Sequence, residues 1–207
     1  DGLRYHLAGP AQWIANQKID HIAGVDYRIN YFPHAGSLLF GWPMVHLRND
    51  VLATVANVIV STVLAPAVIA SGAQRFGVNS RLAWIIGIAT ATSMPFFLAR
   101  KTEFVDALFW LAAGYAILLC FYRPDNRLRT AVAPAFAMGI ALGTKTFGIL
   151  FFPIAGLTWM LAQRVAVGPA PLVDRRHVLR GAFAATIALL IGGWSYAANI
   201  AGHGNPV

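Results

Sequence analysis

The residues of this chain that could carry chemistry are a few carboxylates and the cations near them. Asp1 opens a short polar segment, and Glu103 and Asp106 are three residues apart, so they share one face at the start of a helix. A carboxylate can take a proton from an attacking hydroxyl, and cations can stabilise a departing phosphate. The cations available for that second role are Arg100, Lys101 and Lys145.

Each of these residues also has a plainer structural interpretation. Asp1 could simply cap the helix that follows it, because aspartate side chains accept hydrogen bonds from the first backbone N–H groups. Asp106 could do the same for the apolar helix expected at 104–122, whose N-terminus favours a negative charge. Lys145 could extend its side chain along an apolar surface to lipid headgroups.

The composition is that of an integral membrane protein. Apolar residues make up 57% of the 207, and charged residues make up 12%, whereas soluble domains usually carry about 25% charged residues. The net charge of +8 is spread between apolar runs instead of forming one basic face, so nucleic acid is not an expected partner. Cys120 is the single cysteine, which excludes a disulfide framework and a thiolate metal site.

The pattern of apolar runs predicts an all-α fold, a polytopic membrane helix bundle with an extracytoplasmic loop. Residues 1–50 form that loop and contain two amphipathic juxtamembrane helices, typical of segments at a membrane interface. Their apolar positions recur at helical spacing: Leu3, Leu7, Ala11 and Ile14 in the first, and Leu38, Leu39, Trp42 and Val45 in the second. Residues 51–207 form the bundle, with about six spans at 51–72, 82–98, 104–122, 131–142, 146–162 and 181–201.

The distribution of basic residues predicts the orientation of the bundle. The loops at 73–81, 122–130 and 163–180 together hold nine arginines against two acids, Asp125 and Asp174. Basic loops stay in the cytoplasm. The segment 1–50, the turn at 99–106 and the C-terminus are therefore expected outside.

Lys145 lies between two short apolar runs, 131–142 and 146–162, which we expect to form a hairpin. A single helix over 131–162 would be about 48 Å long, too long for a bilayer without severe tilt. The first run reaches only about 18 Å, so Lys145 is expected at membrane depth, where a lysine is costly unless it faces water or an anion. Gly143 and Gly148 leave room for irregular backbone beside it.

Several short motifs occur in an order that resembles a known family. They are Asp1 to Trp13 with Tyr5-His6-Leu7, Phe32-Pro33-His34, Phe104-Val105-Asp106, Gly143-Thr144-Lys145 and Gly204-Asn205-Pro206-Val207. The series is similar to that of bacterial GT-C-fold membrane glycosyltransferases, the relatives of protein mannosyltransferases and lipid A aminoarabinose transferases. It departs from that pattern at Ala8, because a proline often follows the Tyr-His-Leu directly.

The resemblance implies a function, a site and a location. The family moves a sugar from a polyprenyl-phosphate donor, its co-substrate, to a glycan, lipid or protein acceptor, with inversion. Asp1 matches the catalytic base, Glu103 and Asp106 match a second acidic motif, and the chain would be a fragment without the first transmembrane helix and the C-terminal part. The donor and acceptor are expected to contact Lys145, Arg100, Lys101, Tyr5, His6 and His34. The location implied is the bacterial inner (plasma) membrane, with the site facing the periplasm or the exterior.

No tightly bound cofactor is expected, and metal use is left open. Asp1 and Asp106, with Glu103, could offer oxygen ligands to Mg²⁺ or Mn²⁺, and His6 or His34 could add nitrogen. No tight ligand spacing supports such a site.

Two other functions fit parts of the pattern. A secondary transporter or lipid flippase would also use an intramembrane lysine and broken helices, although the chain shows no internal repeat. A non-catalytic membrane assembly subunit is the third hypothesis.

Overall fold

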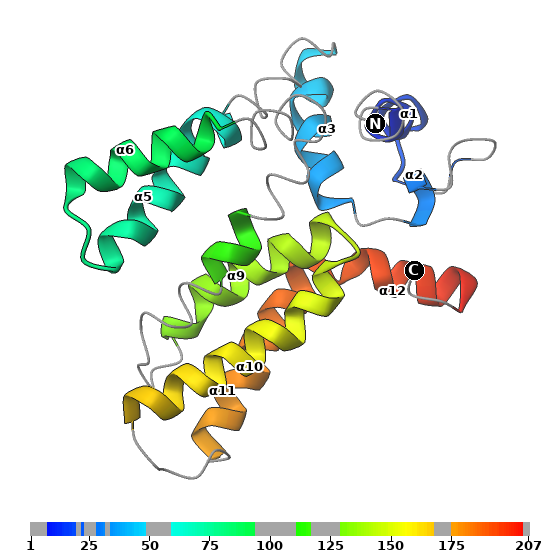
Figure 1. The fold of residues 1–207 in the computed structure, drawn as a ribbon. Coiled ribbons are helices and arrows are strands. Elements are labelled where there is room, and N and C mark those ends of the chain that lie inside the picture. Colours follow the sequence, from blue (N-terminus) through cyan, green and yellow to red (C-terminus); the bar gives the residue numbers. More distant parts are fainter. Residues whose placement is uncertain are drawn as a thin grey trace. The chain divides into compact units, whose positions relative to one another are not determined.

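The computed structural model describes residues 8–19, 22, 28–31, 34–48, 59–93, 111–116, 129–167 and 175–204. These residues form helices and short connecting turns, and no strand occurs among them, which confirms the all-α prediction (Figure 1). The chain divides into two compact units, 1–108 with 207, and 109–206. The boundary expected at residue 50 from composition stays a prediction.

In the first unit, three helices surround a small core near the N-terminus. They are α1 (Ala8–Asn16), α2 (Arg28–Tyr31) and α3 (Ala35–Leu47). The core consists of Trp13, Ile22 and Ile29, against which Ala8 and Leu38 pack. The side chain of Asn30 makes two hydrogen bonds to the backbone of Ile22. Its Oδ1 accepts from the Ile22 N–H at 2.9 Å, and its Nδ2 donates to the Ile22 carbonyl at 3.0 Å.

The two expected amphipathic segments are helical over α1 and α3, but α3 turns only part of the expected apolar stripe toward the core. Its buried positions include Ser37 and Gly41, and Gly41 lies so close to α1 that a Cβ there would stand 3.2 Å from Cβ of Pro10. Trp42 is 69% exposed, and Val45 is also exposed. In α3, Leu38 and small residues therefore pack toward the core, whereas Trp42 and Val45 point away from it.

A helical hairpin follows in the same unit. A π-helical turn, η2 (Val60–Leu64), leads into α5 (Ala65–Arg75), and α6 (Ser80–Ala91) packs along α5. Pro66 was expected to kink this segment, and the change from π to α geometry falls just before it, because proline cannot donate the usual backbone hydrogen bond. The turn uses Gly77 at a φ of 87°, and Asn79 caps α6 by accepting from the Leu82 N–H at 2.9 Å.

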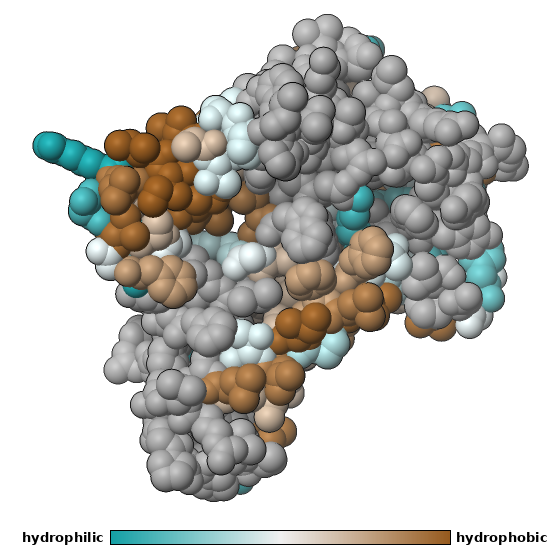
Figure 2. Space-filling view, in the orientation of Figure 1, coloured by the Kyte–Doolittle hydropathy of each residue, from teal (hydrophilic) through white to brown (hydrophobic). Residues whose placement is uncertain are grey.

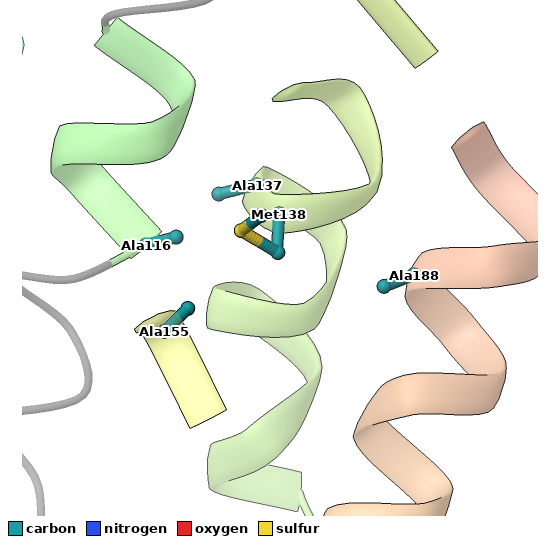
Figure 3. Close-up of a cluster of buried hydrophobic side chains, with 5 residues drawn as sticks. All are labelled: Ala116, Ala137, Met138, Ala155 and Ala188. Carbon is teal, nitrogen blue, oxygen red and sulfur yellow. The ribbon is translucent and has the colours of Figure 1, made fainter. Parts of the chain in front are cut away.

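The second unit is built around α9 (Arg129–Thr144). It packs against both α10 (Gly148–Val167) and α11 (Arg175–Gly192), and α12 (Trp194–His203) continues from α11. Figure 3 shows Met138 of α9 beside alanines of three neighbouring helices, one of them in the short helix 111–116. The helix break at Lys145 is present, so one continuous helix over 131–162 is excluded.

Outside the small core of Trp13, Ile22 and Ile29, both units share an unusual distribution of side-chain size. The buried apolar residues are mostly alanines, with glycines at the closest approaches, as where a Cβ on Gly87 would stand 2.5 Å from the Pro66 carbonyl oxygen. Large aliphatic and aromatic side chains lie outside, for example Ile85 and Leu190, the latter 77% exposed. Figure 2 shows the resulting hydrophobic surface over the α5–α6 hairpin and along α10. Packing by small residues brings helix backbones into close contact.

One expected span takes a different form in the structure. The segment 181–201 was predicted to be one helix, but α11 and α12 are separated by a break at Gly193 and bent by 70°. By length and composition the bent pair Val178–Gly192 and Trp194–His203 could cross a membrane together. In the described part of the chain, no helix taken singly meets the length and apolarity that a crossing requires. The expectation of about six spans is therefore not established.

Candidate functional site

The turn at Lys145 is the part of the candidate site that the structure describes in most detail. α9 ends at Thr144, and the Lys145 N–H still donates to the Ala141 carbonyl at 3.3 Å. The Lys145 carbonyl then accepts from the Gly148 N–H at 2.8 Å, which starts α10. The chain therefore reverses within three residues, and Lys145 is half-buried at the point of reversal.

Tyr196 of α12 is hydrogen-bonded to this turn. Its hydroxyl donates to the Leu142 carbonyl at 2.9 Å and lies 3.3 Å from the Lys145 carbonyl. The last carbonyls of a helix have no partner within the helix, so a buried hydroxyl that reaches them satisfies groups that would otherwise be costly. The position of Lys145 therefore depends on the bend between α11 and α12.

Glycines allow the elements to meet this closely. A Cβ on Gly148 would stand 2.5 Å from the Leu142 Cα, and a Cβ on Gly192 would overlap the carbonyl oxygen of Gly139 and lie 2.6 Å from the Gly143 nitrogen. Any side chain at Gly148 or Gly192 would push the helices apart. At Gly148 the missing side chain permits close helix packing, whereas the expectation that glycines permit irregular backbone beside Lys145 stays a prediction.

The same region holds buried polar side chains. Ser195, Tyr196 and Asn199 of α12 are all buried, and so is Thr144, whose hydroxyl donates back to the Ile140 carbonyl. In the described structure the hydroxyl oxygens of Thr146 and Ser195 are buried without a hydrogen-bond partner. Thr146 follows Lys145 in the chain, and Ser195 precedes Tyr196. Buried polar atoms of this kind are usually satisfied, so these two have capacity to bind a polar group.

Taken together, the turn offers one ammonium group and hydroxyls in an otherwise apolar helix bundle. Lys145 is the only charged residue between Arg129 and Arg164. Ammonium and hydroxyl donors suit an anion with several oxygens, such as a phosphate. The described part of the site can therefore bind a phosphate group, but it contains no carboxylate that could act as a base.

Of the residues predicted for the site, only Lys145 and His34 are described. His34 is buried in the first unit and packs edge-on against Trp13 with ring centroids 4.8 Å apart, so it belongs to the core around α1. His34 belongs to the first unit and Lys145 to the second. The other predicted residues lie outside the described residues: Asp1, Tyr5, His6, Arg100, Lys101, Glu103 and Asp106.

Most of the residues that were expected to bind a metal ion lie outside the part of the chain that the structure describes. Within the described ranges, no three His, Cys, Asp or Glu side chains come together as a metal site would need. The carboxylates expected to hold Mg²⁺ or Mn²⁺, Asp1 and Asp106, are not among those residues.

Sequence reasoning missed the contribution of α12. The signal was present, because Ser195 and Asn199 are polar residues four apart within an apolar run, directly after the Gly192-Gly193 pair. A polar stripe beside two glycines predicts a break with one polar face. What the pattern could not reveal is that Tyr196 reaches a helix end more than 50 residues earlier in the chain.

Comparisons of the chain with protein-family models, with curated proteins and with solved structures find no match. The resemblance to GT-C-fold glycosyltransferases therefore rests on the motif series alone.

Proposed function

We propose that the chain forms part of a polytopic membrane protein. The support is the distribution of side-chain size, with alanine and glycine inside and large apolar residues outside. A soluble bundle gains stability by burying its large apolar side chains, whereas in lipid those side chains can face the solvent. The uncharged runs and the basic loops of the sequence agree with the same placement.

Within that membrane protein, we propose a glycosyltransferase site on the extracytoplasmic face. It moves a sugar from a polyprenyl-phosphate donor to an acceptor hydroxyl. The observation that carries the proposal is the placement of Lys145 in a helix break, half-buried, held by Tyr196 and beside buried hydroxyls. A cation so placed suits the phosphate of a donor whose chain lies in the membrane.

The proposed reaction needs a base as well as a phosphate site. The acceptor oxygen attacks the anomeric carbon as its proton passes to the carboxylate of Asp1. The bond from that carbon to the phosphate oxygen breaks, and the bonding electrons leave with the polyprenyl phosphate. Lys145, with Arg100 or Lys101, stabilises the charge that develops there. Attack from the face opposite the phosphate inverts the anomeric carbon.

The remaining predicted residues have supporting roles in this proposal. Glu103 and Asp106 shape the acidic side of the site, and Tyr5 and His6 contact the sugars. His34 has no part in the proposal, because its side chain is buried against Trp13. Should Mg²⁺ or Mn²⁺ take part, Asp1 and Asp106 would hold it, and the ion would supply further positive charge for the phosphate.

The experiment that tests the proposal supplies the protein, reconstituted in vesicles, with a radiolabelled polyprenyl-phosphate sugar and candidate acceptors. Release of polyprenyl phosphate, together with label on an acceptor, is the expected result. Intact donor after prolonged incubation with glycan, lipid and protein acceptors would contradict it. Donor consumption that does not depend on Lys145 would also contradict the assigned phosphate site.

A transporter or flippase remains the second candidate because of one observation. The 70° bend between α11 and α12 beside Lys145 is typical of the discontinuous helices at transporter binding sites. The same assay separates the two functions: a flippase moves the lipid-linked sugar between leaflets without cleaving it, whereas a transferase cleaves it.

A further inference from the structure

A second candidate site lies within the bundle of the second unit, away from Lys145. A cavity of about 120 Å³ is formed between α9, α10 and α11. Most of its lining is apolar and small, with Pro134, Met138 and Phe152 as the larger side chains. Among the described residues that line it, Arg180 is the only charged one, and its side chain is 2% exposed.

The chemistry of this lining favours a ligand with one anionic end and one apolar end. A guanidinium group keeps its charge at all ordinary pH values and presents a planar set of N–H donors that matches phosphate oxygens. The rest of the cavity can receive only apolar groups. Its size is close to that of cavities, of about 150 Å³, that hold a benzene molecule. A short stretch of hydrocarbon chain next to a phosphate fits both parts.

The cavity is separate from the turn at Lys145. Ala131 and Ala135, near the start of α9, line it, whereas Lys145 follows the last residue of that helix. Fourteen residues separate Ala131 from Lys145, which is about 21 Å at the helical rise per residue. The lining residues nearest to the turn, Met138 of α9 and Phe152 of α10, are each seven positions from Lys145, about 10 Å at the same rise. The cavity therefore begins about 10 Å from the proposed donor site and extends toward the start of α9.

The position of Arg180 also indicates which membrane surface the cavity faces. It lies within two turns of the start of α11, in the segment 163–180 that the sequence assigns to the side with the excess of arginines. Under the proposed topology this is the cytoplasmic side. Anionic lipids are enriched in that leaflet, and basic pockets between transmembrane helices bind their headgroups.

We propose that this cavity binds an anionic phospholipid, with the phosphate at Arg180 and part of one acyl chain among the alanines of α9 and α11. The inference rests on the membrane placement proposed above, but it does not depend on the sugar-transfer reaction. A lipid held there would fill the space between three helices. It would thereby stabilise the same bundle that positions Lys145.

The test is native mass spectrometry of the detergent-purified protein titrated with phosphatidylglycerol, phosphatidylcholine or inorganic phosphate. Phosphatidylglycerol is expected to bind better than phosphatidylcholine. Arg180→Gln should reduce its affinity about tenfold or more, the usual size of a lost charge-assisted hydrogen bond. The control Arg175→Gln removes an exposed arginine of the same helix and should change the affinity by less than about twofold.

A second variant keeps the test decisive should Arg180→Gln fail to fold. Ala184→Leu fills the cavity and leaves the guanidinium in place, and it should weaken phosphatidylglycerol binding to a similar extent. Unchanged binding in Ala184→Leu would overturn the proposal. Inorganic phosphate that binds as tightly as the lipid would also overturn it, because the apolar part of the cavity would then contribute nothing. Donor turnover is measured separately, so loss of this site and loss of the transferase proposal are distinguishable.

Discussion

The hydroxyl of Tyr196 donates a hydrogen bond to the carbonyl of Leu142 across 2.9 Å, although the two residues are 54 positions apart in the chain. Leu142 is in the last turn of α9, just before Lys145, and Tyr196 follows the bend between α11 and α12. The bond therefore links the two helix breaks of the second unit. The position of Lys145 therefore depends on the packing of α12 against α9 as well as on the local turn.

Tyr196→Phe tests this link directly. Removal of the hydroxyl leaves the Leu142 carbonyl without that partner, so the free energy of unfolding should fall by about 1–2 kcal/mol. Affinity for the lipid-linked donor should also fall, since Lys145 loses its support. Thermal unfolding in detergent and donor binding are the two measurements.

Tyr115→Phe is the matched control, because within the described ranges the hydroxyl of Tyr115 makes no hydrogen bond while its ring packs on the core cluster around Met138. It should leave both quantities nearly unchanged. Equal effects from the two substitutions would show that Tyr196 contributes only its ring.

Much of the fold was predictable because apolar runs and their breaks are local features of the sequence. Gly143, Lys145 and Gly148 indicated a helix break, which occurs. Pro66 was expected to kink the span 51–72, and a π-helical turn precedes it. The faces of the helices were harder to predict. In α3 the pattern pointed to Leu38, Leu39, Trp42 and Val45 as the apolar stripe. Leu38 packs on the core, but Trp42 and Val45 are exposed, since close packing to α1 uses small residues such as Gly41.

The candidate site was predictable only at Lys145. The 70° bend at Gly193 was missed because residues 181–201 read as one continuous apolar run. The role of Tyr196 was missed because nothing in the neighbouring sequence indicates that its hydroxyl bonds to a residue 54 positions away. The carboxylates Asp1, Glu103 and Asp106 stay predictions, since they lie outside the described residues.

The close contact of α9 and α11 predicts a sharp difference between two glycine substitutions. Gly192→Ala would force a Cβ into the Gly139 carbonyl oxygen, so it should destabilise the protein by about 1–3 kcal/mol or more. Gly156→Ala, in the middle of α10, meets no atom within 4 Å and should be neutral or stabilising. Thermal unfolding of both variants is the measurement. Similar melting temperatures of the two variants would contradict the close approach of Gly192 to Gly139.

The proposed topology predicts that α1 and the start of α6 face opposite sides of the membrane. Gln12 and Ser80 are both exposed, so each can be replaced by cysteine after Cys120→Ala removes the native thiol. A membrane-impermeant thiol reagent added outside should label Gln12→Cys and not Ser80→Cys, and detergent should make both reactive. Labelling of both from the outside would contradict the orientation.

Charge at Lys145 should affect donor binding as well as turnover. Lys145→Ala should weaken donor affinity and also slow the reaction, because the phosphate feels the ammonium group in the ground state and in the transition state. Lys145→Arg should retain most of the affinity, whereas Lys18→Ala, which removes an exposed lysine after α1, should change neither quantity. Unchanged donor affinity in Lys145→Ala would favour a lysine that merely extends to lipid headgroups.

The most direct test of the central claim is the turnover of a polyprenyl-phosphate sugar by the reconstituted protein and by its Asp1→Asn variant. The account predicts that the wild-type protein releases polyprenyl phosphate. The variant should bind the donor with similar affinity but turn it over at least about a hundredfold more slowly, the typical contribution of a general base. Wild-type protein that cleaves no such donor, or a variant with near wild-type turnover, would contradict the account.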